Sequence, residues 1–137
     1  MPTFIARILD WPYFTLLARI ALTFPFWGSS LSKLIDFPAG VAEMEQFGLR
    51  PAWLITCLVI FTQLGGSLLI IANRRAWSGA GALAIFTLLT IPIAHDFWNL
   101  RGHAAQMEFY IAVEHISVIG GLMLAAILSR QSKYQGA

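Results

Sequence analysis

The stretch EFYIAVEHISVIGGLMLAAIL, residues 108–128, decides the fold class, because about 20 predominantly apolar residues are enough for a helix to cross a bilayer. Its first half nevertheless contains two adjacent ionisable side chains, Glu114 and His115. An ionisable group inside a membrane is stable only if it is paired, hydrated or turned toward other helices. The stretch therefore predicts a membrane-spanning helix that carries a polar feature.

The overall composition also indicates an integral membrane protein. Of the 137 residues, 58% are hydrophobic and only 12% are charged, whereas a soluble domain has about 25% charged residues. The net charge of +2 is spread along the chain, which argues against a basic patch for nucleic acid. The single cysteine, Cys57, excludes an internal disulfide and a Cys-x-x-Cys metal or redox pair.

Four apolar windows have the length of a membrane span: residues 13–35, 51–72, 76–95 and 107–128. They predict an all-α integral membrane four-helix bundle that forms a single domain, residues 1–137. The first window follows Arg7 but lacks an Ala-x-Ala cleavage site, so we expect it to be retained as a span. Glycine pairs at residues 65–66 and 120–121 predict close approaches between helices.

The distribution of Lys and Arg predicts that both termini are cytoplasmic, because cytoplasmic segments are enriched in these residues. The side with both termini and the second connection carries Arg7, Arg74, Arg75, Arg130 and Lys133. The opposite side carries only Lys33, Arg50 and Arg101. We therefore expect a multi-pass protein of the bacterial inner membrane, in contact with lipid, whose first and third connections face outward.

The first of these connections, DFPAGVAEMEQFGLRP at residues 36–51, predicts a short outer amphipathic helix. Its signals are an N-cap, apolar residues at helical spacing and a stop: Asp36, Val41, Met44, Phe47 and Gly48. The helix either rests on the bundle or forms a lid over a site.

Two polar residues lie deep within the first two predicted spans. Arg19 and Gln63 have similar depths for a rise of about 1.5 Å per residue. We expect the Arg19 guanidinium to donate a hydrogen bond to the Gln63 side-chain oxygen. The contact would clamp the two helices or contribute to a ligand site.

A second polar cluster is expected near the outer edge of the bundle. Its members come from the ends of three spans: Lys33, His95, Asp96, His103, Glu108, Glu114 and His115. Adjacent helical residues point about 100° apart, so Glu114 and His115 cannot both face one partner. We expect one of them to face the bundle and the other a neighbouring helix or a second protein.

Three interpretations of this cluster remain open. Lys33 or His95 could pair with Glu114 in a network that only holds the helices together. Alternatively, His95 or His115 would bind a carbonyl oxygen of a quinone head group while Glu114 or Asp96 accepts a proton. A metal site is the third interpretation and the least favoured, because no His-x-x-His or Glu-x-x-His spacing is present.

Aromatic residues and prolines near the cluster are compatible with a flat bound ring. Pro25 and Pro92 each remove a backbone hydrogen bond from a span and can open space beside Trp27 and His95. The same residues also suit ordinary helix packing.

Several stretches together resemble the DoxX family of membrane proteins. They are LARIALTFPFWGSSLSKLIDF, EQFGLRPAWL, LGGSLLI, AHDFW and MEFYIAVEHISVIGGLMLA, in this order along the chain. The resemblance implies a four-helix membrane protein associated with membrane redox complexes, since the family is named after a subunit of a thiosulfate:quinone oxidoreductase. Arg19, Lys33 and His95 occupy positions typical of the family. The chain departs from the family pattern at Gln63, often Glu, and at Glu114-His115, often Lys-Asn.

We therefore expect a small subunit or accessory protein of a quinone-linked redox system. The expected catalytic residues are His95, Asp96, Glu114 and His115, and the expected quinone-binding residues are Trp27, Lys33, Arg19 and Gln63. The chain has no dithiol or haem-attachment motif, so electron transfer would require a partner protein in a complex or a bound cofactor. The alternative is a non-catalytic assembly subunit of a larger membrane complex, and a homo-oligomer is a further possibility.

Overall fold

The computed structural model describes residues 2–134, which are 87% helical and contain no strand. The helices are α1 (Thr3–Leu9), α2 (Pro12–Ile35), α3 (Phe37–Gln46), α4 (Ala52–Ile71), α5 (Ala76–Ala94), the 3-10 helix η1 (Phe97–Asn99) and α6 (Gly102–Tyr134). The all-α prediction is confirmed. The fourth predicted window lies inside a longer helix, because α6 begins at Gly102 rather than at residue 107.

The predicted short helix between the first two long helices is confirmed as α3. The Asp36 side chain caps it by accepting a hydrogen bond from the Ala39 backbone N–H at 3.1 Å. Met44 is buried, whereas Gly48 ends the segment with a φ of +71°, a conformation that glycine adopts without strain. The amphipathic pattern therefore places α3 against the other helices.

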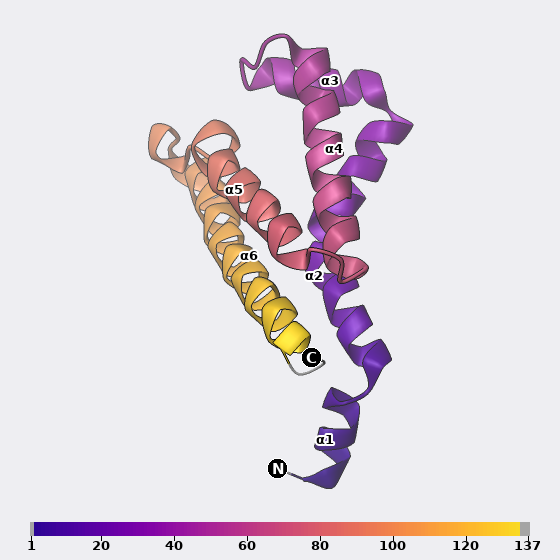
Figure 1. Ribbon diagram of the computed structural model, residues 1–137. Coiled ribbons are helices and arrows are strands. Elements are labelled where there is room, and N and C mark those ends of the chain that lie inside the picture. Colours follow the sequence, from indigo (N-terminus) through magenta and orange to yellow (C-terminus); the bar gives the residue numbers. More distant parts are fainter. Residues whose placement is uncertain (1, 135–137) are drawn as a thin grey trace.

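The long helices form two pairs that meet near the α4–α5 turn and diverge toward α3 (Figure 1). Helix α2 packs on α4, α4 on α5 and α5 on α6, while α3 packs on α2 and α4. The end that carries α3 and η1 is called the α3 end below, and the opposite end is called the turn end. Helix α1 and the last turns of α6 both lie toward the turn end (Figure 1).

Close helix crossings explain one glycine of each predicted pair. A Cβ atom on Gly79 would lie 2.6 Å from the Gly66 carbonyl oxygen, so α4 and α5 are in backbone contact here. A Cβ atom on Gly121 would lie 2.8 Å from Leu22 Cδ1, which places α6 against α2. The other members, Gly65 and Gly120, face open space. Beside these crossings lies the core, formed by Phe26, Ile70, Ala80, Leu83 and Leu122.

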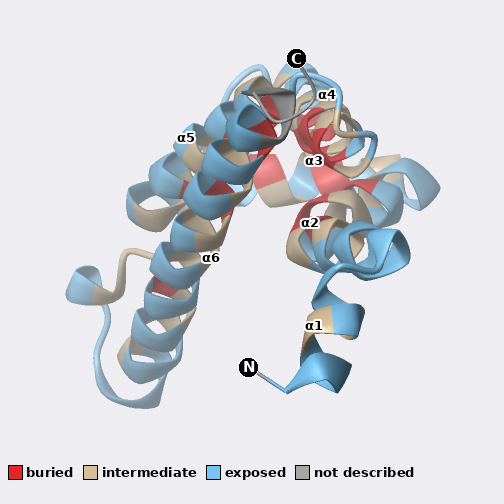
Figure 2. Cartoon of the chain, turned by 60° about the horizontal axis from the view of Figure 1, so that its bottom comes forward, coloured by how far each residue is buried: buried red, intermediate tan, exposed pale blue. Residues whose placement is uncertain are grey.

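Within residues 2–134, three helical segments are long and apolar enough to cross a membrane: Ala52–Ile71, Ala76–Asn99 and Gly102–Gln131. Buried residues line the facing sides of the helices, and exposed residues cover their outer sides (Figure 2). Many exposed residues are large and apolar, such as Phe61 at 77% exposure, as expected for a surface in contact with lipid tails. The chain is a membrane protein.

The first predicted window, residues 13–35, forms helix α2 but is not among these three segments. Its 24 residues have sufficient length, but the sequence includes Arg19, Lys33 and three serines, which lower its hydropathy. The prediction that α2 also crosses the membrane, as a fourth span beside these three, therefore stays a prediction.

Candidate functional site

A cavity of about 450 Å³ lies at the α3 end, between the diverging helix pairs. Helices α2 to α6 all contribute to its wall. Most of the lining is apolar and includes Phe26, Met44 and Phe86. Its ionisable and amide groups are Lys33, Glu43, Gln63, His95 and His115. Ligand sites in proteins have this combination of an apolar wall and a few polar groups.

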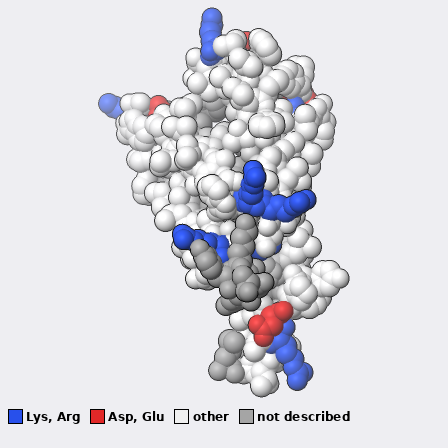
Figure 3. Space-filling model, viewed as in Figure 1, with Lys and Arg blue, Asp and Glu red and all other residues white. Residues whose placement is uncertain are grey.

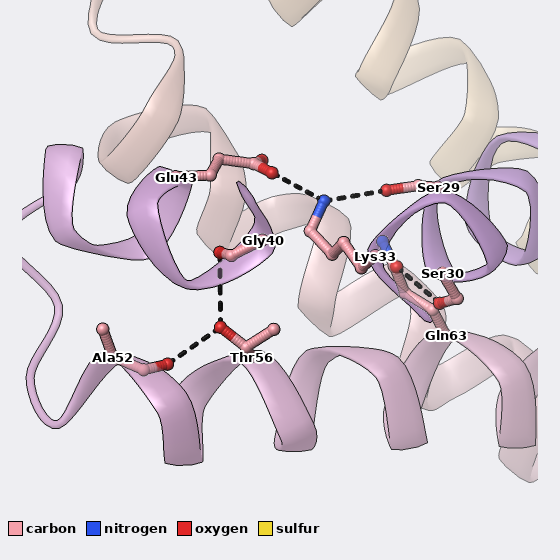
Figure 4. Close-up of polar contacts among 8 residues, drawn as sticks. All are labelled: Ser29, Ser30, Lys33, Gly40, Glu43, Ala52, Thr56 and Gln63. Carbon is pink, nitrogen blue, oxygen red and sulfur yellow. Dashed lines mark hydrogen bonds and ion pairs between the residues drawn. The ribbon is translucent and has the colours of Figure 1, made fainter. Parts of the chain in front are cut away.

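Lys33 connects α2 to α3 at the edge of this cavity. Its Nζ lies 2.8 Å from Glu43 Oε2 and donates to Ser29 Oγ at 3.2 Å (Figure 4). The Lys33 side chain is only 11% exposed, whereas Glu43 is 42% exposed. A cation this deeply buried needs a carboxylate partner, so Glu43 holds α3 in place over the cavity.

Thr56 of α4 also holds α3 in place, through a contact with the α3 backbone. Thr56 Oγ1 lies 3.3 Å from the Gly40 carbonyl oxygen and 2.9 Å from the Ala52 carbonyl oxygen (Figure 4). A Cβ atom on Gly40 would approach Lys33 Cγ and Thr56 Cγ2 to 3.2 Å each. Glycine therefore permits α3 to lie close to α2 and α4.

Gln63 joins α4 to α2 deeper in the same cavity. Ser30 Oγ donates to Gln63 Oε1 at 2.8 Å, and both residues are buried. This bond assigns the amide orientation and leaves Gln63 Nε2 without a hydrogen-bond partner among residues 2–134. The predicted contact between Arg19 and Gln63 is wrong, because Ser30 occupies the acceptor and the Arg19 side chain makes no hydrogen bond in the described chain.

Two histidines from different helices meet on the cavity wall. His95, directly after α5, and His115 of α6 have ring centroids 4.7 Å apart at an interplanar angle of 66°. His95 Nδ1 lies 2.7 Å from Glu108 Oε2, also on α6. His115 Nδ1 lies 2.8 Å from the Ile111 carbonyl oxygen.

These contacts fix which imidazole nitrogens remain available. A carbonyl oxygen only accepts, so His115 Nδ1 carries hydrogen and donates to Ile111. The carboxylate of Glu108 likewise favours hydrogen on His95 Nδ1. Within the described part of the chain, neither Nε2 atom has a hydrogen-bond partner. Both Nε2 atoms are therefore available to bind a polar group of a ligand.

The remaining predicted site residues lie away from the cavity lining. Glu114 is exposed on α6, and Asp96 Oδ2 accepts from Asn99 Nδ2 at 3.0 Å beside η1. Trp27 Nε1 donates to the Ile20 carbonyl oxygen at 3.3 Å and its ring packs on Phe24. Arg19, on the same helix as Trp27, does not line the cavity either.

The structure thus assembles four of the eight predicted residues: Lys33, Gln63, His95 and His115. The predicted pairing of Glu114 with Lys33 or His95 is wrong, since Glu43 and Glu108 are the observed partners. The sequence analysis did not predict Glu43 as a site residue. Its position on the short amphipathic helix that directly follows Lys33 could have indicated it. Among the described residues, no three His, Cys, Asp or Glu side chains form a metal-binding group.

Comparisons with known proteins place the chain among membrane proteins. The sequence model of the DoxX family matches residues 14–96. Inner membrane protein YphA of Escherichia coli is 25% identical over 116 residues, covering 85% of this chain and 83% of that protein. The Surfeit locus protein 4 homolog of Schizosaccharomyces pombe is 29% identical over 120 residues, covering 84% of this chain but 36% of that protein. No solved structure matches the chain.

Proposed function

The chain belongs to the DoxX family, and from this membership and the cavity at the α3 end we propose that it is an inner-membrane protein that binds the head group of a quinone. It serves a quinone-linked redox system as a small subunit or accessory protein. The observation that carries the proposal is the pair of imidazoles on the cavity wall, His95 and His115, of which His95 contacts Glu108.

In this proposal α2 is the fourth span and closes a four-helix bundle. Its 24 residues reach about 36 Å, longer than the roughly 30 Å hydrocarbon core. Arg19 would lie about 10 Å from the turn end of α2, where a long side chain can extend toward the head groups. Both termini then lie on one side, which is cytoplasmic because it carries Arg74 and Arg75. The name of the E. coli relative supports the inner membrane.

The cavity has the dimensions and chemistry that a quinone head group requires. Its volume of about 450 Å³ lies within the usual range of roughly 300–1,000 Å³ for small-molecule sites. The apolar wall suits a ring, the Gln63 amide N–H can donate to a quinone carbonyl oxygen, and the imidazole Nε2 atoms can accept from the hydroxyl groups of the reduced quinol. Its position between diverging helices suits a lipid-soluble ligand that arrives from the bilayer.

Different side chains of the cavity bind the head group and exchange its protons. A quinone supplies reversible transfer of two electrons and two protons. Gln63 Nε2 donates to one oxygen of the head group and His115 Nε2 accepts from a hydroxyl group of the quinol, since Gln63 Oε1 and His115 Nδ1 are already engaged. His95 Nε2 exchanges a proton, while Glu108 holds the opposite nitrogen and stabilises the imidazolium that results. Glu108 is 30% exposed, so its carboxylate can pass the proton toward the α3 end.

The proposal is tested by the quinone content of protein purified in lipid nanodiscs. His115→Phe keeps a ring in the wall but removes its nitrogens, and His103→Phe is the control because His103 is exposed outside the cavity. We expect wild type and His103→Phe to retain a quinone measured by extraction and chromatography, and His115→Phe to lose most of it. Equal content in all three proteins would refute the proposed site.

Glu114 supports a second candidate function, that of a non-catalytic assembly subunit. It lies in a candidate membrane span, is exposed, and forms no hydrogen bond or ion pair with residues 2–134. A carboxylate facing lipid is unfavourable by several kcal/mol unless a partner supplies a polar or basic group. Contact with a polar or basic group of another polypeptide at this position would offset that unfavourable free energy.

A further inference from the structure

The cavity at the α3 end has two walls that differ in hydrogen-bonding character. Helices α2, α3 and α4 form one wall, and α5 and α6 form the other. The polar side chains of the second wall are Thr87, Thr90, His95 and His115. These four residues are called the acceptor wall below, because each of them already donates its hydrogen to another part of the protein.

The two threonines of the acceptor wall donate to the backbone of their own helix. Thr87 Oγ1 donates to the Leu83 carbonyl oxygen at 2.7 Å. Thr90 Oγ1 donates to the Thr87 carbonyl oxygen at 2.8 Å. A hydroxyl group has one hydrogen to donate, so each of these side chains can offer a ligand only the lone pairs of its oxygen.

The two imidazoles of the acceptor wall are in the same condition. His115 Nδ1 donates to the Ile111 carbonyl oxygen, and His95 Nδ1 donates to the Glu108 carboxylate. A neutral imidazole has a single N–H, so the Nε2 atom of each ring is an acceptor. Both rings line the cavity. The whole acceptor wall therefore presents hydrogen-bond acceptors to a ligand and no free donor.

The opposite wall still has donors. Lys33 Nζ has three N–H groups, of which Glu43 and Ser29 engage two. Gln63 Nε2 also retains its N–H groups, because Ser30 engages only the Gln63 oxygen. A carbonyl oxygen and a hydroxyl oxygen can both accept from such donors. This wall therefore does not distinguish an oxidised quinone from its reduced quinol.

The surroundings of the cavity make an unsatisfied polar group unfavourable. The lining between the two walls is apolar and includes Phe26, Met44 and Phe86. On the face shown in Figure 3, uncharged residues form almost all of the surface between the α3 end and the α4–α5 turn. A ligand oxygen that meets only acceptors in such a place loses its hydrogen bond to water without replacing it.

From these contacts we infer that the site selects the quinol over the quinone, an inference that rests on the proposed function. A quinol hydroxyl donates to an imidazole Nε2 of the acceptor wall. A quinone carbonyl in the same place turns its lone pairs toward another lone pair. The second oxygen of the ring accepts from Gln63 in either oxidation state. Quinol forms where another membrane enzyme reduces a quinone, so the site takes up the product of such a reaction.

The binding of decylubiquinol and decylubiquinone to the full chain in lipid nanodiscs, measured separately, tests this selectivity. Empty nanodiscs are the blank, exclusion of oxygen keeps the quinol reduced, and pH 8 is suitable because imidazole is ordinarily neutral there. We expect the quinol to bind at least about fivefold more tightly, which corresponds to one hydrogen bond. Equal binding, or tighter binding of the quinone, would overturn the selectivity but leave the proposed function in place. Binding of neither form would refute both.

Variants locate the selectivity on the acceptor wall. His115→Phe keeps a ring but removes an acceptor, so it should lose most of the preference, and His95→Phe makes the same test if His115→Phe loses helicity in circular dichroism. Gln63→Leu should weaken both forms by a similar factor, and His103→Phe, outside the cavity, should match the wild-type protein. A preference that is unchanged in both folded variants of the acceptor wall, or that is lost in Gln63→Leu, would overturn the assignment.

Discussion

His95 Nδ1 lies 2.7 Å from Glu108 Oε2, a contact that joins the end of α5 to the first turns of α6. The helices are connected here by η1 and a short segment that ends at Gly102, whose φ is +63°. The tight connection therefore places a carboxylate beside the imidazole on the cavity wall. His95 lines the proposed quinone site beside His115, whose ring it contacts, so the His95–Glu108 pair adjoins that site.

Replacement of Glu108 should weaken quinone binding by an amount that depends on the acceptor left behind. Glu108→Gln retains an oxygen that accepts from His95 Nδ1, so we expect a small effect. Glu108→Ala leaves the ring unsupported, and the loss of one hydrogen bond of about 1 kcal/mol should weaken binding about fivefold. Titration of nanodisc-embedded protein with decylubiquinone measures both. Glu45→Ala, on the exposed side of α3, should have no effect. Identical affinities for Glu108→Gln and Glu108→Ala would contradict the orienting role.

The pair of Lys33 and Glu43 should show strong non-additivity. Glu43→Gln leaves a nearly buried ammonium without its carboxylate, and we expect destabilisation of about 1–3 kcal/mol. Lys33→Met should cost less, because Glu43 is exposed enough to be hydrated. The double variant should be more stable than Glu43→Gln alone. Thermal unfolding in detergent measures all four proteins, and additive losses would show that the two side chains act independently.

Much of the fold could be predicted because its signals are local. Apolar length fixed the three spanning segments, and the spacing of Met44 and Phe47 after a capping Asp36 fixed α3. The 100° separation of Glu114 and His115 correctly implied that only one of them faces the bundle. Each of these predictions depends on residues within a few turns of one helix.

The contacts between helices could not be predicted in the same way. Equal depth suggested that Arg19 meets Gln63, but depth does not specify the direction in which a side chain points, and Gln63 faces Ser30 instead. The carboxylate partner of His95 depended on where α6 begins, and its start at Gly102 brings Glu108 beside the ring. Both errors concern the rotation or start of a helix, which its own apolar pattern specifies poorly.

The crossing at Gly79 gives a prediction with a control on the same helix. Gly79→Ala would place a Cβ atom 2.6 Å from the Gly66 carbonyl oxygen, so α4 and α5 must separate. We expect a clear decrease in Tm and a loss of helix packing. A Cβ atom on Gly81, two residues away, would have no atom within 4 Å. Alanine favours a helix over glycine by up to about 1 kcal/mol, so Gly81→Ala should leave Tm unchanged or raise it. Equal effects of the two substitutions would contradict the crossing.

The exposed carboxylate of Glu114 distinguishes a subunit from a protein that functions alone. If another polypeptide, or a second copy of the chain, supplies its partner, Glu114→Leu should remove that contact and shift the mass of the native assembly toward the single chain. Ser117→Leu changes a neighbouring exposed position of α6 without altering charge and is the matched control. Native mass spectrometry from nanodiscs reads out both variants. If wild type and Glu114→Leu both occur only as single chains, the carboxylate meets no protein partner, and the assembly function loses the observation that supports it.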